Sequence, residues 1–344
     1  MKLHSLAILA NVQSSGTVGG AEIFHKKLAE AFSRYVDCVD LVEVPCCEDS
    51  FDTIMESYRR CYDLNVLKYD AVLSSKAPTF AVRHPNHVCY LMHTVRVFYD
   101  MFEELNAHPV NFERRQLLFR MDKELLSPPR TKAVYTIGEE VSERIRKYIG
   151  IESTALHPGM TDEGFYTAQA GDYIYLPGRL HRWKRVDLCI EAMRYVKTPV
   201  RLKIAGSGEQ EQELRALSAN LPRVEFLGRV SDEEMKCLYA NALAVAFTPL
   251  REDYGYILHE AFKSEKPVLT CTDSGEPARF IRSGENGFLC SPDPREIAAR
   301  IDEFYLHREK SAAMGRCGKK SIESITWDAV VETLLPVLEE KLPR

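Results

Sequence analysis

The sequence lacks the features that would place it in several specialised classes of protein. No apolar run approaches the roughly 20 residues that a membrane-spanning helix requires. Basic residues are not in excess, since 45 Lys and Arg stand against 50 Asp and Glu, which argues against a dedicated nucleic-acid-binding protein. No internal repeat or low-complexity tract is found. An ordinary globular protein remains, and its 344 residues predict two domains of about 150 residues each.

Cysteine spacing excludes two further kinds of site. The ten cysteines are scattered, only Cys46 and Cys47 are adjacent, and no C-x-x-C pair occurs. This spacing supports neither a zinc site nor a redox motif, so we expect free thiols in a reducing cytoplasm. The stretch MKLHSLAILANVQSSG (1–16) has some likeness to a signal peptide, but its apolar part is short and more typical of a first buried strand.

The second half of the sequence alternates between short apolar runs and helical patterns. Strands are expected at residues 172–178, 200–206, 224–228, 243–249, 266–271 and 286–292. Helices are expected at about 185–196, 209–221 and 231–242. Ser231 and Glu234 form a capping-box pattern at the start of the third helix. Such alternation with short connections predicts an α/β fold with a parallel, doubly wound sheet.

The first half shows the same alternation less regularly. Strands are expected at residues 5–12, 38–44, 69–75, 87–93 and 132–138, with a helix at 21–32. A polar segment at 157–172, with Pro158 and Gly159, is the expected linker. We therefore expect domains at 1–160 and 161–326, with a last helix at about 327–344 that packs back on the first domain. Two such sheets place ligand-binding loops at the carboxyl ends of their strands, so a ligand is expected in a cleft between the domains.

The stretch REDYGYILHEAF (251–262) places two carboxylates around an expected helix start. Backbone amides near Tyr256 to Leu258 could hold a phosphate, and Gly255 would let a ligand approach the backbone. A carboxylate beside a phosphate is repelled, so Glu252 and Glu260 are better suited to neutral donors such as sugar hydroxyls. A nucleotide sugar has hydroxyls at both ends of a diphosphate. The alternative, a capping acid plus a solvated helical glutamate, remains open on this stretch alone.

A second candidate site lies in LPGRLHRWKRVD (176–187). Arg179 ends a strand and Lys184 begins the following helix, which places two cations on one loop after the Gly178 turn. Paired cations suit a diphosphate whose negative charge grows as it departs. Surface basic residues on a loop are the alternative, although the pairing makes it less favoured.

A set of motifs in both halves is shared with a known enzyme family. Arg179-x4-Lys184 is followed by AGSGE (205–209), FLGRVSDEEM (226–235), Glu252-x7-Glu260 and KPVL (266–269). This order resembles the GT-B retaining glycosyltransferases of family 4, over essentially all of 173–295. Weaker likeness lies in GTVGGAEIFHKKLAEAF (16–32), YLMHTVRVFYD (90–100), TIGEEVSERI (136–145) and LHPGMTDEGF (156–165).

The resemblance implies a fold and an activity. The fold would be GT-B, two Rossmann-like domains facing a central cleft, with the acceptor on the amino-terminal domain and the nucleotide sugar on the other. The activity would be retaining transfer of a hexose from a UDP- or GDP-linked sugar to a hydroxyl acceptor, such as a growing glycan or a lipid-linked saccharide. No metal or other cofactor is implied, and the sequence has no D-x-D triplet.

The resemblance also implies site residues. Arg179 and Lys184 would hold the diphosphate, Glu260 the ribose and Glu252 the transferred sugar. His93 would lie beside that sugar, although a histidine at a strand end is more often structural. The other implied donor-binding residues are Gly19, Gly20, Gly206, Arg229, Val230, Asp253, Gly255, Tyr256, Ile257 and Leu258.

Three residues depart from the family pattern. Glu265 and Glu276 stand where glycine is usual, and Arg279 stands where glutamate is usual. We expect them at the edge of the site, where they would affect sugar and acceptor preference. The segment 111–126 predicts an amphipathic, partly basic helix; core packing is its usual role, and peripheral contact with the inner face of a membrane is an alternative.

Three other functions are alternatives for a chain of this kind. A dinucleotide oxidoreductase is disfavoured because no G-x-G-x-x-G follows the first strand. A GT-B sugar-nucleotide epimerase would share the fold and the diphosphate site without an acceptor. A degenerate binding protein is disfavoured because both cations and both glutamates are present.

Overall fold

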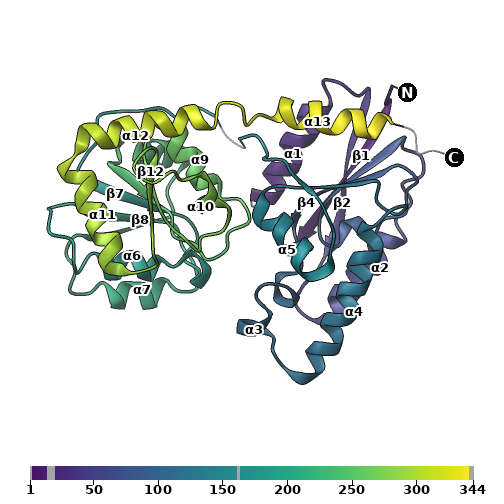
Figure 1. Ribbon diagram of the computed structural model, residues 1–344, viewed down its shortest axis with the longest axis horizontal. Coiled ribbons are helices and arrows are strands. Elements are labelled where there is room, and N and C mark those ends of the chain that lie inside the picture. The colour runs from purple at the N-terminus through teal and green to yellow at the C-terminus, as the bar shows by residue number, and fades with distance from the viewer. Residues whose placement is uncertain (1, 14–19, 161–162, 341–344) are drawn as a thin grey trace. The chain divides into compact units, whose positions relative to one another are not determined.

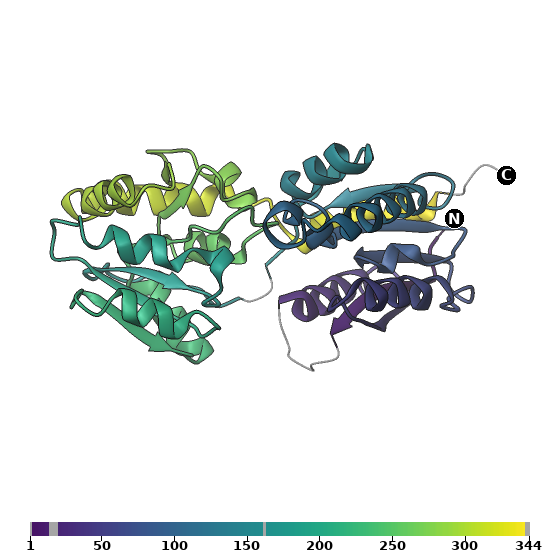
Figure 2. The ribbon, with the colours of Figure 1, turned by 90° about the horizontal axis from the view of Figure 1, so that it is seen from below.

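The protein is described by a computed structural model that covers residues 2–13, 20–160 and 163–340, and the chain divides into two compact units. Unit 1 consists of Met1–Thr161 and Ile325–Arg344, and unit 2 consists of Asp162–Ser324. Each unit contains one six-stranded parallel sheet with helices on both of its faces (Figures 1 and 2). The predicted α/β fold with two doubly wound sheets is confirmed.

The sheet of unit 1 has the order β2-β1-β3-β4-β5-β6. Its strands are β1 (Ser5–Gln13), β2 (Cys38–Cys46), β3 (Ala71–Lys76), β4 (His87–His93), β5 (Ala133–Thr136) and β6 (Thr154–Ala155). The apolar run Leu6 to Ala10 in β1 is almost fully buried, as expected for a parallel strand that is covered on both faces. The stretch that resembled a signal peptide therefore forms a central strand of this sheet.

The helices of unit 1 include the last helix of the chain. The α-helices are α1 (Gly20–Phe32), α2 (Phe51–Tyr62), α3 (Phe102–Leu105), α4 (Pro109–Leu126), α5 (Glu139–Ile149) and α13 (Trp327–Glu339), with 3-10 turns at Thr79–Ala81 and Arg96–Phe98. α13 buries Val330, Val331 and Leu334. The indole of Trp327 lies 5.3 Å from the Phe24 ring of α1, measured between centroids, so α13 packs on unit 1.

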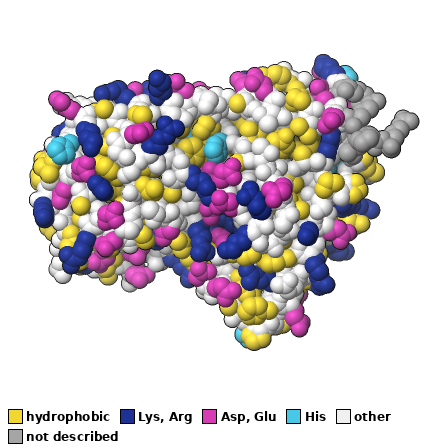
Figure 3. Space-filling view, in the orientation of Figure 1, with side chains coloured by type: hydrophobic (Ala, Val, Ile, Leu, Met, Phe, Trp, Pro, Cys, Tyr) yellow, Lys and Arg dark blue, Asp and Glu magenta, His cyan; other side chains and the backbone are white. Residues whose placement is uncertain are grey.

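Helix α4 packs with one face against unit 1, and that face includes an acid. Its buried residues are Leu118, Asp122 and Leu126, so a carboxylate lies among the packed side chains. Asp122 accepts hydrogen bonds of 2.5 Å from the hydroxyls of both Tyr58 and Tyr99. Hydrophobic side chains are instead exposed where α3 meets α4, at the narrow end of unit 1 in Figure 3. Among the helices of the described residues, none combines the length and apolarity needed to cross a membrane.

The sheet of unit 2 has the order β12-β11-β10-β7-β8-β9. Its strands are β7 (Tyr173–Pro177), β8 (Arg201–Ala205), β9 (Val224–Gly228), β10 (Ala244–Ala246), β11 (Val268–Cys271) and β12 (Gly287–Cys290). The chain adds β8 and β9 on one side of β7 and then returns to add β10 to β12 on the other side. The strand order therefore reverses between β7 and β10, which in open α/β sheets is where a crevice for ligands forms.

The helices of unit 2 are α6 (Val186–Ala192), α7 (Glu211–Leu217), α8 (Asp232–Asn241), α9 (Tyr256–Lys263), α10 (Glu276–Phe280), α11 (Pro294–Leu306) and α12 (Arg308–Ser321), with a 3-10 turn, η3, at Arg182–Lys184. Two of these helices, α6 and α7, are shorter than predicted. The predicted capping box of α8 is confirmed, because the Ser231 amide donates to Glu234 Oε2 (2.9 Å) and the Glu234 amide donates to Ser231 Oγ (3.2 Å).

Candidate active site

Two loops of unit 2 leave the sheet at the point where its strand order reverses. One loop runs from Gly178 to Arg185 after β7, and the other runs from Phe247 to Gly255 after β10. The Leu250 amide donates to the Trp183 carbonyl over 2.8 Å, which joins the loops directly. Most of the predicted diphosphate and sugar residues lie on these two loops.

Lys184 and Glu252, which were predicted from separate motifs, form an ion pair. Lys184 Nζ lies 2.7 Å from Glu252 Oε2, and their side chains are only 20% and 24% exposed. The ammonium also lies 5.5 Å from the centroid of the Phe247 ring. Glu252 is therefore not a capping acid of α9, whose N-cap residue is Gly255. Its carboxylate is held by the cation that the sequence assigned to the diphosphate.

The start of α9 supplies fewer amides than the sequence predicted. Gly255 has φ +89°, and a Cβ at this position would lie 2.6 Å from Phe247 Cε1. Left-handed backbone and packing against protein thus require glycine here without any ligand. The Leu258 amide already donates to the Gly255 carbonyl (3.1 Å), whereas Tyr256 and Ile257 occupy the first two helical positions, whose amides a helix leaves without an intrahelical acceptor.

Glu260 is a half-buried acid among tyrosines. The Tyr239 hydroxyl of α8 donates to Glu260 Oε2 over 2.5 Å. Burial, and then the negative charge of Glu260, raise the pKa of Tyr239, Tyr256 and Tyr175. The Tyr239 hydrogen bond and the partial burial show that Glu260 is not fully exposed to solvent. The alternative of a solvated helical glutamate is therefore wrong for this residue.

The loops after β8 and β9 complete the same edge of the sheet. Gly206 has φ +135°, and a Cβ there would lie 1.8 Å from the Gly178 carbonyl oxygen, so the β7 and β8 loops pass in direct backbone contact. Arg229, after β9, donates from Nε to Ser207 Oγ over 2.9 Å. Val230 follows it, half-buried, before α8.

Of the remaining predicted residues, two lie on the site loops of unit 2 and the others lie in unit 1. Arg179 is exposed, directly after Gly178, and Asp253 is half-buried beside Glu252. In unit 1, His93 is the last residue of β4, half-buried, and its carbonyl accepts from the Ala77 amide (3.0 Å). Gly20 is the first residue of α1, and Gly19 lies outside the described residues.

One of the departures from the family pattern, Glu265, does not lie at the edge of the site as expected. Glu265 precedes β11, at the opposite edge of the sheet from the site, so it is not a site-edge residue. Its φ of +55° explains why glycine is usual there, and Lys319 pairs with its carboxylate at 2.8 Å. Glu276 is 1% exposed, and its amide donates to the Glu252 carbonyl over 2.9 Å, so it directly adjoins the site.

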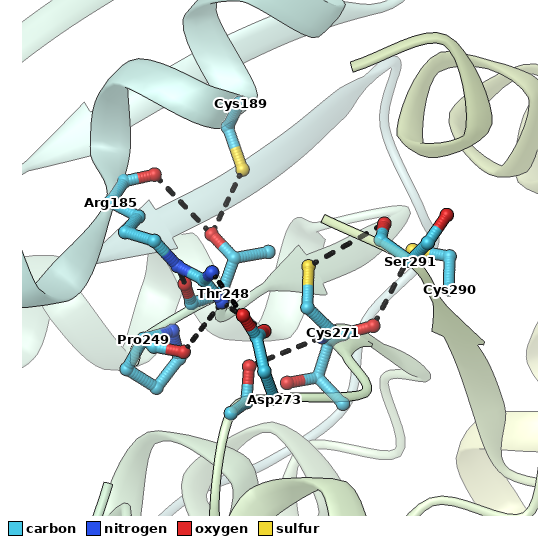
Figure 4. Close-up of polar contacts among 10 residues, drawn as sticks. Arg185, Cys189, Thr248, Pro249, Cys271, Asp273, Cys290 and Ser291 are labelled. Carbon is cyan, nitrogen blue, oxygen red and sulfur yellow. Dashed lines mark hydrogen bonds and ion pairs between the residues drawn. The ribbon is translucent and has the colours of Figure 1, made fainter. Parts of the chain in front are cut away.

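Two residues that sequence reasoning missed connect the loops. Arg185 binds Asp273 with both arms of its guanidinium, at 2.7 and 2.6 Å, and also bonds the carbonyls of Thr248 and Pro249 (Figure 4). Asp273 follows β11. No sequence pattern indicates this contact, because Arg185 lies close behind other basic residues and resembles part of an exposed basic run.

His, Cys, Asp and Glu side chains form no group of three or more able to hold a metal ion within the residues that the structure describes.

Most of unit 2 is similar to a known protein family. Residues 167–321, which make up most of unit 2, match the family described as glycosyl transferases group 1. Human alpha-1,3/1,6-mannosyltransferase ALG2 is 30% identical over 167 residues, which cover 47% of this chain and 38% of ALG2. The putative glycosyltransferase EpsD of Bacillus subtilis is 30% identical over 216 residues, 60% of this chain and 54% of EpsD. The chain thus spans less than two thirds of the length of these relatives.

Solved structures show the same fold over the whole chain. Anabaena HepE, solved with UDP and glucose, superimposes with a TM-score of 0.71 and 17% identity, covering 97% of this chain and 99% of HepE. The fold is thus the two-domain α/β fold of GT-B type. Most of unit 2 is thus similar to the domain of the glycosyl transferases group 1 family.

Proposed function

We propose that the protein is a retaining glycosyltransferase that moves a hexose from a UDP- or GDP-linked sugar to a hydroxyl acceptor. The observation that carries the proposal is the Lys184–Glu252 pair at the strand-order reversal of a group 1 domain. A cation for a departing diphosphate and an acid for sugar hydroxyls are adjacent there. HepE, whose structure holds UDP and glucose, supports a nucleotide-sugar donor of this kind.

In this proposal Lys184 stabilises the diphosphate as its charge grows. An ammonium has three N–H donors, so Lys184 can keep Glu252 as one partner and donate to a phosphate oxygen with another. Arg179 and the first amides of α9 would supply further positive potential without a metal ion. Glu252, oriented by Lys184, would accept hydrogen bonds from hydroxyls of the transferred sugar.

Glu260 is proposed to hold the ribose of the donor. The Tyr239 hydroxyl donates to Oε2 and orients the carboxylate, which has several acceptor lone pairs and can also accept from a ribose hydroxyl. Because the ribose changes little during the reaction, this contact would contribute binding rather than rate. Arg229 and Val230, after β9, are proposed to line the base.

A donor screen tests the proposal. The protein is incubated with UDP-glucose, UDP-galactose, UDP-N-acetylglucosamine and GDP-mannose, with and without oligosaccharide acceptors, and released nucleoside diphosphate is measured. Proton NMR of the product then reports its anomeric configuration. We expect one donor to be consumed with retention. Epimerisation of the donor sugar without transfer, or no consumption of any donor, would contradict the proposal.

Other parts of the assignment stay predictions. The acceptor is predicted to be a growing glycan or a lipid-linked saccharide, and ALG2 and EpsD point to glycan synthesis through their names alone. The roles of His93, Gly19 and Gly20, the cytoplasmic location and the peripheral membrane contact rest on the sequence.

A further inference from the structure

We infer that Arg185 is a positioning residue that holds the Lys184 and Glu252 loops in their working geometry, with Asp273 as its anchor. This inference rests on the function proposed above. Its basis is one side chain that bonds the loops after β10 and β11 from a third loop, the one after β7 (Figure 4).

The guanidinium makes four hydrogen bonds, all to groups on the two neighbouring loops. Nε donates to the Thr248 carbonyl (2.8 Å) and Nη2 donates to the Pro249 carbonyl (2.8 Å). Nη1 and Nη2 also donate to the two oxygens of Asp273, at 2.7 and 2.6 Å. A planar fork with fixed donors is needed for this arrangement, and lysine cannot reproduce it.

The bonded carbonyls belong to the residues just before the sugar-binding segment. Pro249 precedes Glu252 by three positions, and Arg185 directly follows Lys184. The anchor loop is joined to the same segment, because the Arg251 amide donates to the Asp273 carbonyl and the Glu252 amide donates to the Ser274 carbonyl. Arg185 therefore sits one residue from the cation and fixes the backbone that carries the acid.

The backbone of Arg185 gives an independent indication of a role for its side chain. Arg185 has φ +48°, in the left-handed region where glycine has no steric cost and other residues are uncommon. If this position mattered only for its backbone, glycine would serve it better. Arginine is therefore disfavoured here by its backbone conformation, and the hydrogen bonds of its guanidinium account for its presence.

The substitution Arg185→Gly separates the two explanations. It removes the guanidinium while relieving the left-handed backbone, so a purely conformational role predicts unchanged or higher activity. A positioning role predicts that kcat/KM for the donor falls by about tenfold to a hundredfold, since small displacements of reacting groups cost that much. Arg185→Lys should lose less activity than Arg185→Gly. The hydrogen bonds from Arg185 to the loops after β10 and β11 form a clamp, which Asp273→Asn should also weaken. The loss of kcat/KM in the double variant Arg185→Gly, Asp273→Asn should therefore be smaller than the product of the two single losses.

Arg182→Gly is the matched control. Arg182 lies three positions earlier, and its exposed guanidinium lies 4.2 Å from the centroid of the Trp183 indole ring, so the substitution removes the same charge without the clamp. Each variant is checked by circular dichroism and assayed well below its melting temperature, with kcat and KM determined for the donor that the wild-type protein consumes. The matching nucleoside monophosphate is titrated as a probe of the Glu260 end, and its Kd should change less than twofold in Arg185→Gly.

The outcomes distinguish this inference from the proposed function. A wild-type protein that consumes a donor, with Arg185→Gly and Asp273→Asn folded and as active as Arg182→Gly, overturns the clamp and leaves the function standing. If Arg185→Gly also loses nucleoside monophosphate binding, the clamp is overturned, because the substitution has then disturbed the whole site and not the two loops alone. A wild-type protein that consumes no donor overturns the function and the clamp together.

Discussion

The Lys184→Ala substitution should separate catalysis from stability. The Lys184–Glu252 pair is about four-fifths buried, so Lys184→Ala leaves a largely buried carboxylate without its partner, which costs about 1–3 kcal/mol. In a unit of this size, about 1 kcal/mol lowers the melting temperature by roughly 2–4 °C. Loss of a group that stabilises developing charge costs about 2.7–4 kcal/mol of activation free energy, or roughly a hundredfold to a thousandfold in kcat. The expected variant is therefore modestly less stable than the wild type but folded, and nearly inactive.

The chain offers a control of the same chemistry. Lys319 pairs with Glu265 at 2.8 Å in the same unit, away from the site loops. Lys319→Ala should produce a similar small change in melting temperature with normal kcat. The assay is steady-state release of nucleoside diphosphate at saturating acceptor, together with thermal unfolding of both variants. If folded Lys184→Ala keeps near-normal kcat, or if Lys319→Ala loses as much, the diphosphate role of Lys184 is refuted.

Four further predictions concern other parts of the chain. Glu260→Gln should mainly raise the donor KM with little change in kcat. Tyr239→Phe should raise the donor KM less, because it removes only the hydroxyl that orients the acid. A fall in kcat as large as the rise in KM would contradict the ribose role. Gly255→Ala should destabilise unit 2 by more than about 1 kcal/mol, whereas Gly284→Ala, at φ +87° with open space around it, should cost less, as denaturant unfolding can show. Burial raises the pKa of Asp122 to about 7, so the folded state binds an extra proton, and the stability that Asp122 contributes is lost as pH rises from about 4 to about 7. Asp122→Asn should remove this pH dependence, measured as the difference in unfolding free energy between wild type and variant at pH 5 and at pH 7. The buried His25 and His87, whose pKa values are lowered to about 4, have the opposite pH dependence, but they are present in both proteins and cancel in this difference. Treatment with EDTA should leave donor turnover largely intact, and activity that returns only with magnesium or manganese would show that a metal is required.

Of the strands in the described residues, all except β6 were accessible from the sequence, in their order along the chain. A parallel strand that is buried on both faces must be a continuous apolar run, and each predicted run corresponds to a strand of the sheets. Helix ends were less accessible, because a cap depends on local hydrogen bonds that the pattern does not contain. The predicted helix at 185–196 thus ends at Ala192.

The contacts within the site were less accessible, because chain order does not reveal which strands are neighbours. β7 is followed by β8 in the sequence, yet its other neighbour is β10, and this pairing brings Lys184 to Glu252 across 68 positions. Asp273, which anchors Arg185, lies 88 positions away on the loop after β11. Motifs therefore identified both partners of the ion pair as site residues, but only the sheet topology shows that they touch.

The return of α13 to unit 1 has a consequence for how the chain is made. Val330, Val331, Leu334 and Leu338 complete the interior of a unit whose other elements all precede residue 161. During synthesis, unit 2 is a continuous segment that can fold as soon as it leaves the ribosome. Unit 1 must instead hold an uncovered apolar surface on the ribosome until residues 325–340 emerge. Chaperone binding to the nascent chain is therefore expected at unit 1, although it is synthesised first.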